Sequence, residues 1–369
     1  MDIASSSDYF HYEALRENGS DVKLIGPFPA SVPAIFPESL IQRIYWRLGK
    51  KWLKYKLINT WKVSQATNRA VKEWEPDIVF SISHQPFVYY SGHIPAVYRV
   101  DTTFYGEHQF LSNYSEPILR VSMWQEKNAF QNCARIITTS EWSKNVLIDV
   151  YGVARERIRV YVNPSALPRN SVPKFIDIPG WKSLKGPLRL LLVGRDFQRK
   201  GINIAIEVTH QLNAAGIKTI LTICGLQGDS NNNVRFVGPY KKNIPEELEQ
   251  YVTLYRQAHL LIHPALFEPA GIVPSEAAAF GTPTITNDNG GIRTSVEPGI
   301  SGIVLPKWSP AEAYVNAIHD LVNHPEVYYK LCRTTRDRYE RELNWDFTGK
   351  WLVETLQEVI YENQKQMGK

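Results

Sequence analysis

LRLLLVGRDFQRKG, residues 188–201, joins an apolar run of strand length to a glycine and to a loop that carries Arg195 and Lys200. A strand, a glycine, two cations and then a helix suit a diphosphate, because the cations neutralise its charge and the loop amides add hydrogen bonds. The same pattern also fits a solvated surface turn. This stretch taken alone therefore leaves both interpretations open.

A second informative stretch is FEPAGIVPSEAAAFGTP, residues 267–283, in which Glu268 and Glu276 stand eight positions apart. Pro274 suits the first turn of a helix, and Gly281 suits its end. The amides before that helix could bind an anion or sugar hydroxyls, and the two carboxylates could accept hydrogen bonds from hydroxyl groups. A helix-start carboxylate within a buried packing motif is the alternative.

Strand-like runs alternate with helical patterns along the whole chain, which predicts an α/β protein with parallel sheets covered by helices on both faces. Helical periodicity is clear in residues 202–213 and 246–258. The strands that we expect lie at residues 22–25, 78–81, 96–100, 135–139, 158–162, 188–193, 219–224, 234–237, 260–263 and 282–286.

The strands form two series, and a segment with five prolines, residues 163–187, lies between them. We expect an N-terminal Rossmann-like domain over residues 1–165, a linker over 166–187 and a C-terminal domain over 188–346. The last helix, residues 347–369, could pack back on the first domain. Two such domains would face a central cleft, where ligands bind beyond the carboxyl ends of the strands.

The two stretches together, with the Gly-Thr-Pro and Gly-Gly that follow, resemble the donor half of the retaining glycosyltransferases of family 4, which have the GT-B fold. The resemblance covers residues 189–303 and extends more weakly into the first half, through IITTSEWSKNVLIDVYGV and VYVNPSA. It implies that Arg195 and Lys200 hold a nucleotide diphosphate. It also implies that Glu276 binds the ribose and that Glu268 lies beside the donor sugar.

The resemblance assigns three further parts of the site. The amides of Ala270, Gly271, Ile272 and Val273 correspond to the loop over the sugar and phosphate. Main-chain groups near Pro239 and Tyr240, in FVGPY, correspond to the cradle of the base. Asp101 follows a strand in the first half where the family often has a His or Asp near the reacting sugar, although a loop-capping role is as plausible.

Two features of the first half depart from that pattern or fall outside it. Family members usually open with an apolar strand and a glycine-rich loop, whereas this chain opens MDIASSSDYFHYEAL, with Ser5–Ser7 where glycines are expected. His84 also follows a strand, and we expect it to be a structural histidine.

Metal and cofactor motifs are missing from the sequence. There is no D-x-D, no HExxH and no Cys/His cluster at zinc spacing. We therefore expect no metal and no bound cofactor, with the diphosphate charge balanced by Arg195, Lys200 and a helix N-terminus.

The net charge of +5 is unevenly spread. Residues 39–65 hold seven basic residues and no acidic one, which leaves −2 for the rest of the chain. A basic helix with three tryptophans over residues 40–63 could contact an anionic membrane, or it could be a solvated helix face. Nucleic acid is disfavoured, because no nucleic-acid motif accompanies the charge. Without a signal-like N-terminus or an apolar run of about 18 residues, we expect a cytoplasmic protein, peripheral at the inner membrane face at most.

These observations predict a retaining, metal-independent glycosyltransferase. It would move a sugar, for which we favour glucose, from a UDP-sugar to a glycan or lipid-linked acceptor in cell-surface polysaccharide or glycolipid assembly. A non-catalytic sugar-nucleotide-binding subunit is the alternative. A glycan phosphorylase on the same fold is a third possibility, which would need a lysine bound to pyridoxal phosphate.

Overall fold

A computed structural model describes residues 6–26, 38–112, 114–174, 177–366 and 368. The chain forms two compact units, each made of separate pieces of sequence. Unit 1 comprises Met1–Phe10, Thr139–Trp142 and Tyr161–Thr348, and unit 2 comprises His11–Thr138, Ser143–Val160 and Gly349–Lys369. Both units are built on parallel sheets, as the alternation of strands and helices predicts.

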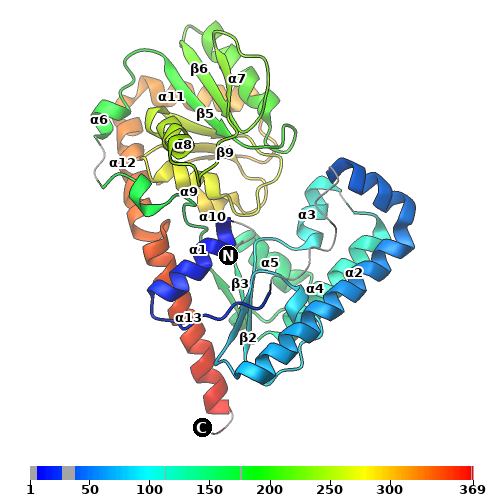
Figure 1. The fold of residues 1–369 in the computed structure, drawn as a ribbon. Coiled ribbons are helices and arrows are strands. Elements are labelled where there is room, and N and C mark those ends of the chain that lie inside the picture. Colours follow the sequence, from blue (N-terminus) through cyan, green and yellow to red (C-terminus); the bar gives the residue numbers. More distant parts are fainter. Residues whose placement is uncertain (1–5, 27–37, 113, 175–176, 367, 369) are drawn as a thin grey trace. The chain divides into compact units, whose positions relative to one another are not determined.

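Unit 1 holds a six-stranded sheet in the order β10-β9-β8-β5-β6-β7, in which all neighbours pair in parallel (Figure 1). Its strands are β5 (Leu188–Val193), β6 (Thr219–Cys224), β7 (Val234–Val237), β8 (Leu260–His263), β9 (Thr284–Asn287) and β10 (Gly302–Leu305). Its helices are α6 (Ile178–Trp181), α7 (Ile202–Ala214), α8 (Pro245–Gln257), α9 (Ile272–Ala278), α10 (Ile292–Ser295), α11 (Ala311–Asn323) and α12 (Pro325–Glu342).

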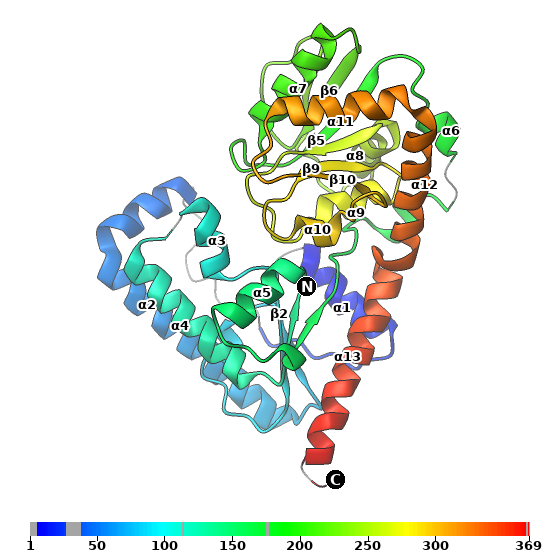
Figure 2. The same ribbon diagram turned by 180° about the vertical axis from the view of Figure 1, so that it is seen from behind.

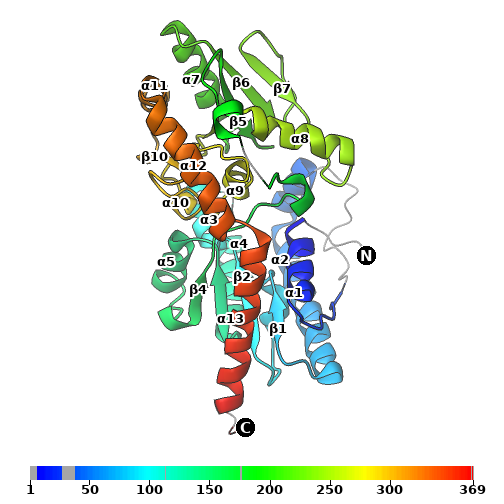
Figure 3. The same cartoon turned by 90° about the vertical axis from the view of Figure 1, so that its left-hand side faces the viewer.

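Helices cover both faces of this sheet. Helices α7 and α11 lie together on one face, as Figure 2 shows, and in Figure 3 α7 and α8 lie on opposite sides of the strands. Alternate residues of a strand point to opposite faces, so Leu190 and Leu192 pack against α7 and α11, whereas Leu191 and Val193 pack against α8 and α9. Strand β5 is therefore apolar on both faces, as the central strand of a parallel sheet must be.

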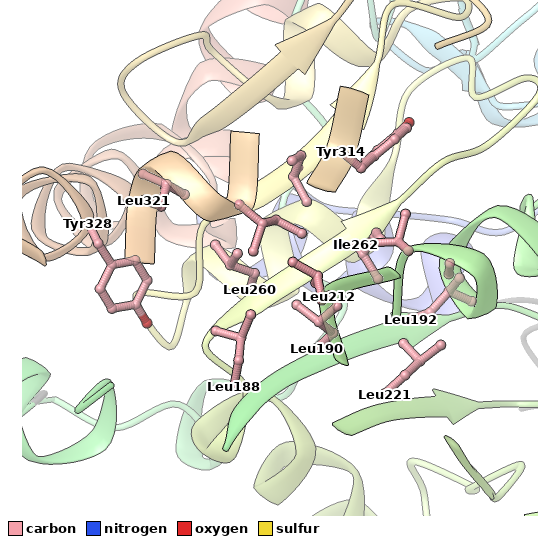
Figure 4. Close-up of a cluster of buried hydrophobic side chains, with 14 of the residues drawn as sticks. Leu188, Leu190, Leu192, Leu212, Leu221, Leu260, Ile262, Tyr314, Leu321 and Tyr328 are labelled. Atoms are coloured by element: carbon pink, nitrogen blue, oxygen red, sulfur yellow. The ribbon is translucent and has the colours of Figure 1, made fainter. Parts of the chain in front are cut away.

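The larger core of unit 1 lies on the α7 and α11 face (Figure 4). Leu190, Ile262 and Leu221 from three strands meet Leu212 of α7 and Tyr314 of α11, and each is at most 1% exposed. Burial of this size fixes the strands in register. The ends of β5 and β8, where the candidate site begins, thus have a rigid support.

Unit 2 holds a four-stranded parallel sheet in the order β1-β2-β3-β4. Its strands are β1 (Val79–Ser81), β2 (Ala96–Val100), β3 (Arg135–Thr138) and β4 (Ile158–Val160). The helices with most of their residues in unit 2 are α1 (Ser6–Glu17), α2 (Glu38–Trp74), α3 (Phe104–Leu111), α4 (Glu116–Asn132), α5 (Glu141–Asp149) and α13 (Trp345–Gln366). The described residues also form three short 3₁₀ turns: Gln85–Phe87, Arg155–Arg157 and Arg169–Ser171.

Strand alternation also explains the two faces of this second sheet. Tyr98 of β2 stacks on Phe130 of α4, with ring centroids 5.5 Å apart. On the opposite face, Arg135 of β3 pairs with Glu362 of α13 at 2.7 Å. The last helix thus runs along unit 2, and Figure 3 shows it beside the strands.

Nine of the ten expected strands are confirmed, and β2, β5, β6, β7 and β8 have the expected bounds. The strand expected at residues 22–25 is wrong: the segment is irregular, and Leu24 is 43% exposed. Its residues are exposed or half-buried, whereas a strand of a parallel sheet needs burial on both faces. β10, one of the two edge strands of unit 1, was not predicted.

The proline-rich segment, expected as a linker over residues 166–187, is part of unit 1. Leu167 and Ile178 are buried in its cores, and Lys182 has no exposed surface. The prolines interrupt helical periodicity, but they do not prevent the segment from packing as irregular chain with one short helix, α6.

The N-terminal serines stand where family members usually have glycines. Ser6 and Ser7 open helix α1, and Ser5 lies outside the described residues. Among the helices that the structure describes, none combines the length and apolar character needed to cross a bilayer.

Candidate active site

Glu268 lies in the loop between β8 and α9, where the backbone is held on both sides. Its amide donates to the carbonyl of Asn289 at 3.1 Å, and its carbonyl accepts from the amide of Gly291 at 2.9 Å. A Cβ atom at Gly291 would come within 1.9 Å of the carbonyl oxygen of Pro269, so only glycine allows this approach. The Gly-Gly pair of the sequence therefore clamps the Glu268 loop.

The Glu268 carboxylate is the centre of a buried polar cluster. Nζ of Lys200 donates to Oε2 at 2.5 Å, and Nε2 of His263 lies 3.3 Å from the same oxygen. Oε1 accepts from the amide of Gly271 at 3.2 Å. Arg199 lies further out, with its guanidinium 3.7 Å from Oε2. Glu268 and Lys200, predicted as neighbours in function, are thus in direct contact.

These contacts set the charges of the cluster. Burial raises the pKa of the Glu268 carboxyl, but the Lys200 ammonium and the hydrogen bond from His263 outweigh burial and hold that pKa well below its usual value. Burial and the nearby Lys200 lower the pKa of His263. At neutral pH the Glu268 carboxylate is therefore ionised and the His263 imidazole is neutral.

Lys200 and Arg195 lie on the loop after β5, in different surroundings. Lys200 is 7% exposed, and its stem packs against Gly194, where a Cβ would approach the Cγ of Lys200 to 2.6 Å. Arg195 is exposed to solvent. The glycine at the end of β5 thus makes room for the Lys200 side chain, while Arg195 remains accessible to an anion.

Ala270 and Gly271 directly precede α9, and Ile272 and Val273 are the first two residues of that helix. The hydroxyl of Ser295 donates to the carbonyl of Ala270, and the Gly271 amide is already bound to Glu268. Ala270 and Gly271 are buried, whereas Ile272 and Val273 are half-buried.

Glu276 lies within α9 and is 1% exposed. Oε1 accepts a hydrogen bond from Nζ of Lys242, and the hydroxyls of Tyr251 and Tyr255 each lie 2.7 Å from Oε2. Burial and the Glu276 charge raise the pKa of both tyrosines well above the usual value, so both keep their protons. Glu276 thus lies in a polar network supplied by α8 and the loop before it.

Pro239 and Tyr240 follow β7, where the base was predicted to bind. Pro239 is exposed and Tyr240 half-exposed. Gly238 has φ +73°, and a Cβ there would lie 3.1 Å from the Tyr240 amide. The loop that holds Lys242 continues from this point into α8.

Lys182, from the proline-rich segment, supports α8 from its C-terminal end. Its Nζ donates to the carbonyls of Tyr255 at 2.9 Å and Ala258 at 2.7 Å, and to Oγ1 of Thr282 at 2.7 Å. Thr282 belongs to the Gly-Thr-Pro of the sequence and also donates to the Tyr255 carbonyl. Burial lowers the pKa of Lys182 to about 7.

Asp101 belongs to unit 2 and follows β2, as predicted. Its carboxylate receives two hydrogen bonds from Arg99, at 2.7 and 3.0 Å, and its side chain is 43% exposed. His84 is in the same unit, with its ring 5.8 Å from that of Phe104, and burial lowers its pKa to about 3. His84 is thus a half-buried neutral histidine, whereas the Asp101 carboxylate is partly exposed.

Near Asp101, sequence reasoning missed a buried carboxylate, Glu126 of α4. It accepts from the Phe104 amide at 3.1 Å and from the hydroxyl of Tyr151, and it fastens the start of α3. Burial raises its pKa to about 8. Lys56, one of the seven basic residues of the basic segment, is turned inward here: it donates to Ser122 at 2.5 Å.

Sequence reasoning also missed His263, Lys242, Tyr251 and Tyr255. The tyrosines are four residues apart on an amphipathic helix, a spacing that puts them on one face but does not reveal what they face. Lys242 follows the predicted base loop in a run of two lysines that reads as surface chain. None of these signals is specific without the fold.

Within the described part of the chain, no three His, Cys, Asp or Glu side chains gather as a metal site. The two clusters of unit 1 are instead pairings of a carboxylate with a lysine. In the first pair, Lys200 follows β5 and Glu268 follows β8. In the second, Lys242 lies between β7 and α8, and Glu276 lies in α9.

Comparisons with known proteins identify the family of the chain. Residues 175–338 match the model described as "Glycosyl transferases group 1", and residues 11–164 match "Glycosyltransferase Family 4". The chain is 25% identical over 301 residues to glycogen synthase of Mycobacterium tuberculosis, covering 74% of this chain and 67% of that protein. It is 22% identical over 281 residues to D-inositol 3-phosphate glycosyltransferase of Paenarthrobacter aurescens, covering 72% and 68%. The chain thus spans about two thirds of the length of these relatives.

Solved structures share the fold. Sucrose-phosphate synthase from Thermosynechococcus elongatus superposes with a TM-score of 0.70 at 18% identity, covering 97% of this chain and 94% of that one. HepE from Anabaena, in complex with UDP-glucose, gives a TM-score of 0.58 at 18% identity, with 80% and 82% covered. At this identity the likeness concerns the fold, and the predicted two-domain α/β architecture is confirmed.

Proposed function

The chain belongs to the GT-B glycosyltransferases of the group 1 and family 4 type, and from this we propose that its donor is a UDP-sugar, with glucose as the sugar transferred. HepE, which shares the fold, has been solved with UDP-glucose and with UDP. The observation that carries the proposal is the buried Lys200–Glu268 cluster at the ends of β5 and β8.

The charges of this cluster suit a leaving diphosphate. An ammonium has three N–H donors, and Lys200 uses one of them on Glu268, so two remain for phosphate oxygens. Arg195, exposed on the same loop, adds a second cation. Charge develops on the diphosphate as its bond to the sugar breaks, so these cations stabilise the transition state more than the ground state.

We assign the remaining contacts to the sugar and the nucleoside. Glu268 accepts hydrogen bonds from sugar hydroxyls, Glu276 binds the ribose, and main-chain groups at Pro239 and Tyr240 contact the base. The Ile272 and Val273 amides, at the start of α9, bind the sugar or phosphate. Asp101 acts near the reacting carbon.

The reaction that we propose proceeds with retention and without a metal. The bond from the anomeric carbon to the diphosphate oxygen breaks, and the acceptor oxygen bonds to that carbon on the same face. The acceptor proton passes to the departing phosphate oxygen, so UDP leaves with that proton. Lys200 and Arg195 supply the positive charge that a divalent cation supplies in other transferases.

For the acceptor we propose a glycan or lipid-linked hydroxyl compound, presented at an anionic membrane surface. Helix α2 carries seven basic residues and no acidic one over residues 39–65. In its described part, Ile58 and Trp61 are 42% and 51% exposed. A basic helix with exposed apolar side chains suits an anionic lipid surface, and the enzyme would work there from the cytoplasmic side.

Release of UDP from a panel of UDP-sugars, with EDTA present and acceptor absent, tests the proposal. We expect slow UDP release from UDP-glucose that EDTA leaves unchanged, because water can replace the acceptor. Release that EDTA abolishes would disprove metal independence. Release from another UDP-sugar alone would replace glucose as the donor sugar.

The same assay weighs the alternative of a non-catalytic subunit. UDP binding without UDP release from any donor, and without transfer to a lipid or glycan panel, would favour that alternative. Absence of UDP binding would remove the uridine assignment and direct the search to other nucleoside diphosphates.

A further inference from the structure

Glu276 has few hydrogen-bonding positions left for a ligand. A carboxylate accepts about four hydrogen bonds, two on each oxygen. On Oε2, two tyrosine oxygens lie at 2.7 Å, and they lie 2.8 Å from each other. The two tyrosines have only two hydroxyl protons for these three contacts, so at least one proton is donated to Oε2. Both hydroxyls also occupy the space around that oxygen. A ligand therefore reaches Glu276 through Oε1.

Oε1 in turn is bound to Lys242. The Lys242 side chain is 31% exposed, whereas that of Glu276 is 1% exposed, so the lysine lies between the carboxylate and solvent. Its ammonium also lies 4.9 Å from the centre of the Tyr251 ring, a cation–π distance that helps to fix it. A molecule that approaches Oε1 from solvent meets the Lys242 ammonium at the same place.

We propose that Lys242 and Glu276 together bind the vicinal diol of the donor's ribose, with one hydroxyl donating to Oε1 of Glu276 and its neighbour accepting from Nζ of Lys242. This inference rests on the proposed function, which assigns a nucleotide donor. It adds a specificity residue that the motif of two glutamates does not contain.

The chemistry of the pair matches a diol. A carboxylate only accepts hydrogen bonds and an ammonium only donates them, while a hydroxyl does both. With Oε2 occupied, Glu276 alone would satisfy one ribose hydroxyl and leave the second without a charged partner. The Lys242 ammonium donates to Glu276 and, at 3.4 Å, to the carbonyl of Ala166, so its third N–H is left for the second hydroxyl. Charge-assisted hydrogen bonds of this kind are the stronger class, so both hydroxyls should contribute to affinity.

The test compares UDP with 2′-deoxy-UDP and 3′-deoxy-UDP, by calorimetric titration of the wild type and the Lys242→Met variant. The wild type should bind each deoxy nucleotide about tenfold or more weakly than UDP. Lys242→Met should bind UDP at least about tenfold more weakly than the wild type does. In this variant, one of the two deoxy nucleotides should bind only about threefold more weakly than UDP, or less. This loss of discrimination is the specific signature, because a general charge effect weakens all three ligands equally.

Lys241→Met is the matched control. It removes the same charge from the adjacent residue, whose side chain is exposed. We expect it to leave the ratios of the three affinities unchanged. Lys242→Gln, which keeps an N–H donor, should recover part of the discrimination, and it replaces Lys242→Met if thermal unfolding shows that the methionine variant does not fold.

Equal weakening of UDP and of both deoxy nucleotides in Lys242→Met would overturn the inference and leave the proposed function intact, since the lysine would then act only on the diphosphate. If the wild type does not bind UDP, the titrations are repeated with ADP and GDP and their deoxy forms. If none of these nucleoside diphosphates binds, the proposed function fails and the inference fails with it.

Discussion

At the scale of single residues, the two carboxylates of the site are held in different ways. Glu268 is bound to Lys200, a residue also assigned to the diphosphate, so the carboxylate and the phosphates share one cation. Glu276 is bound to Lys242 and two tyrosines, none of which belongs to the recognised motif. Changes at the two positions should therefore have different effects on nucleotide binding.

Glu268→Gln should leave UDP binding intact or tighten it by up to about tenfold, while it abolishes sugar transfer. Loss of the carboxylate charge frees the Lys200 ammonium for the phosphates, and it also removes the acceptor for the sugar hydroxyls. Titration with UDP and a transfer assay on the same preparation measure both effects.

Glu276→Gln is the comparison for that experiment. It should weaken UDP by about tenfold or more, because a charged acceptor for the ribose is lost. If both variants lose UDP affinity equally, the division of roles between the two glutamates is wrong.

The sequence predicted these glutamates because both sit within one short motif with Pro274 and Gly281. Lys242 was beyond prediction, because its contact to Glu276 joins residues that lie 34 positions apart and belong to no common motif. His263 was missed for a related reason: a lone histidine at the end of an apolar strand carries no signal until the neighbouring loop is placed.

At the scale of elements, α8 depends on a cap that comes from outside the helix. The last carbonyls of a helix have no partner within it, and here Lys182 and Thr282 satisfy them. The same helix supplies the two tyrosines of Glu276. The cap therefore supports the geometry of the candidate ribose site.

Lys182→Met should lower the free energy of unfolding of unit 1 by about 3 kcal/mol, because it keeps the apolar stem and leaves buried carbonyls without a donor. Urea denaturation followed by tryptophan fluorescence measures the loss. Lys185→Met removes an exposed lysine of the same segment and should change stability by about 0.5 kcal/mol at most. A Lys182 variant as stable as this control would show that the cap is unimportant.

The lowered pKa of Lys182 predicts how the free energy of unfolding changes with pH. The unfolded lysine keeps its proton up to pH about 10.5, and the folded one loses it near pH 7. Between these values the unfolded state binds more protons, so this group makes stability rise with pH. The stability of the wild type relative to Lys182→Met should accordingly increase from pH 7 to pH 9.

Four of the six strands of unit 1, β5, β6, β7 and β8, were predicted to the residue, because glycine, proline or polar residues flank their apolar runs. Residues 22–25 resemble these runs in sequence but form no strand. Whether a short apolar run becomes a strand depends on neighbouring strands to pair with and on burial of its faces. β10 escaped notice because its run, GIVL, is short and lies at the edge of the sheet. Lys182 shows a further limit: a proline-rich stretch gives no hint that one of its lysines is fully buried.

At the scale of the whole molecule, charge is distributed unevenly. Residues 39–65 carry +7, and the remainder of the chain carries −2. Lys56 is half-buried and bound to Ser122, so the other six cations must carry any attraction to an anionic surface. Such attraction is screened by salt.

Sedimentation with vesicles tests this attraction. We expect binding to vesicles that contain about 30% phosphatidylserine, no binding to neutral phosphatidylcholine, and release near 0.5 M salt, as electrostatic attraction requires. Trp61→Ala combined with Lys62→Glu should reduce binding severalfold and leave UDP release unchanged. Trp308→Ala, which removes an exposed tryptophan of unit 1, serves as the control. Equal binding to neutral vesicles would contradict the electrostatic account.

The interleaving of the two units has a practical consequence for anyone who wishes to dissect the chain. A donor-half fragment cut at the start of β5 would appear natural, yet it would lack residues 139–142 and 161–187, which belong to unit 1. Such a fragment would lose Lys182, leave the end of α8 bare, and expose the apolar surface that Leu167 and Ile178 cover. Poor solubility of that fragment would reflect where it was cut, and would say nothing about the stability of the intact enzyme.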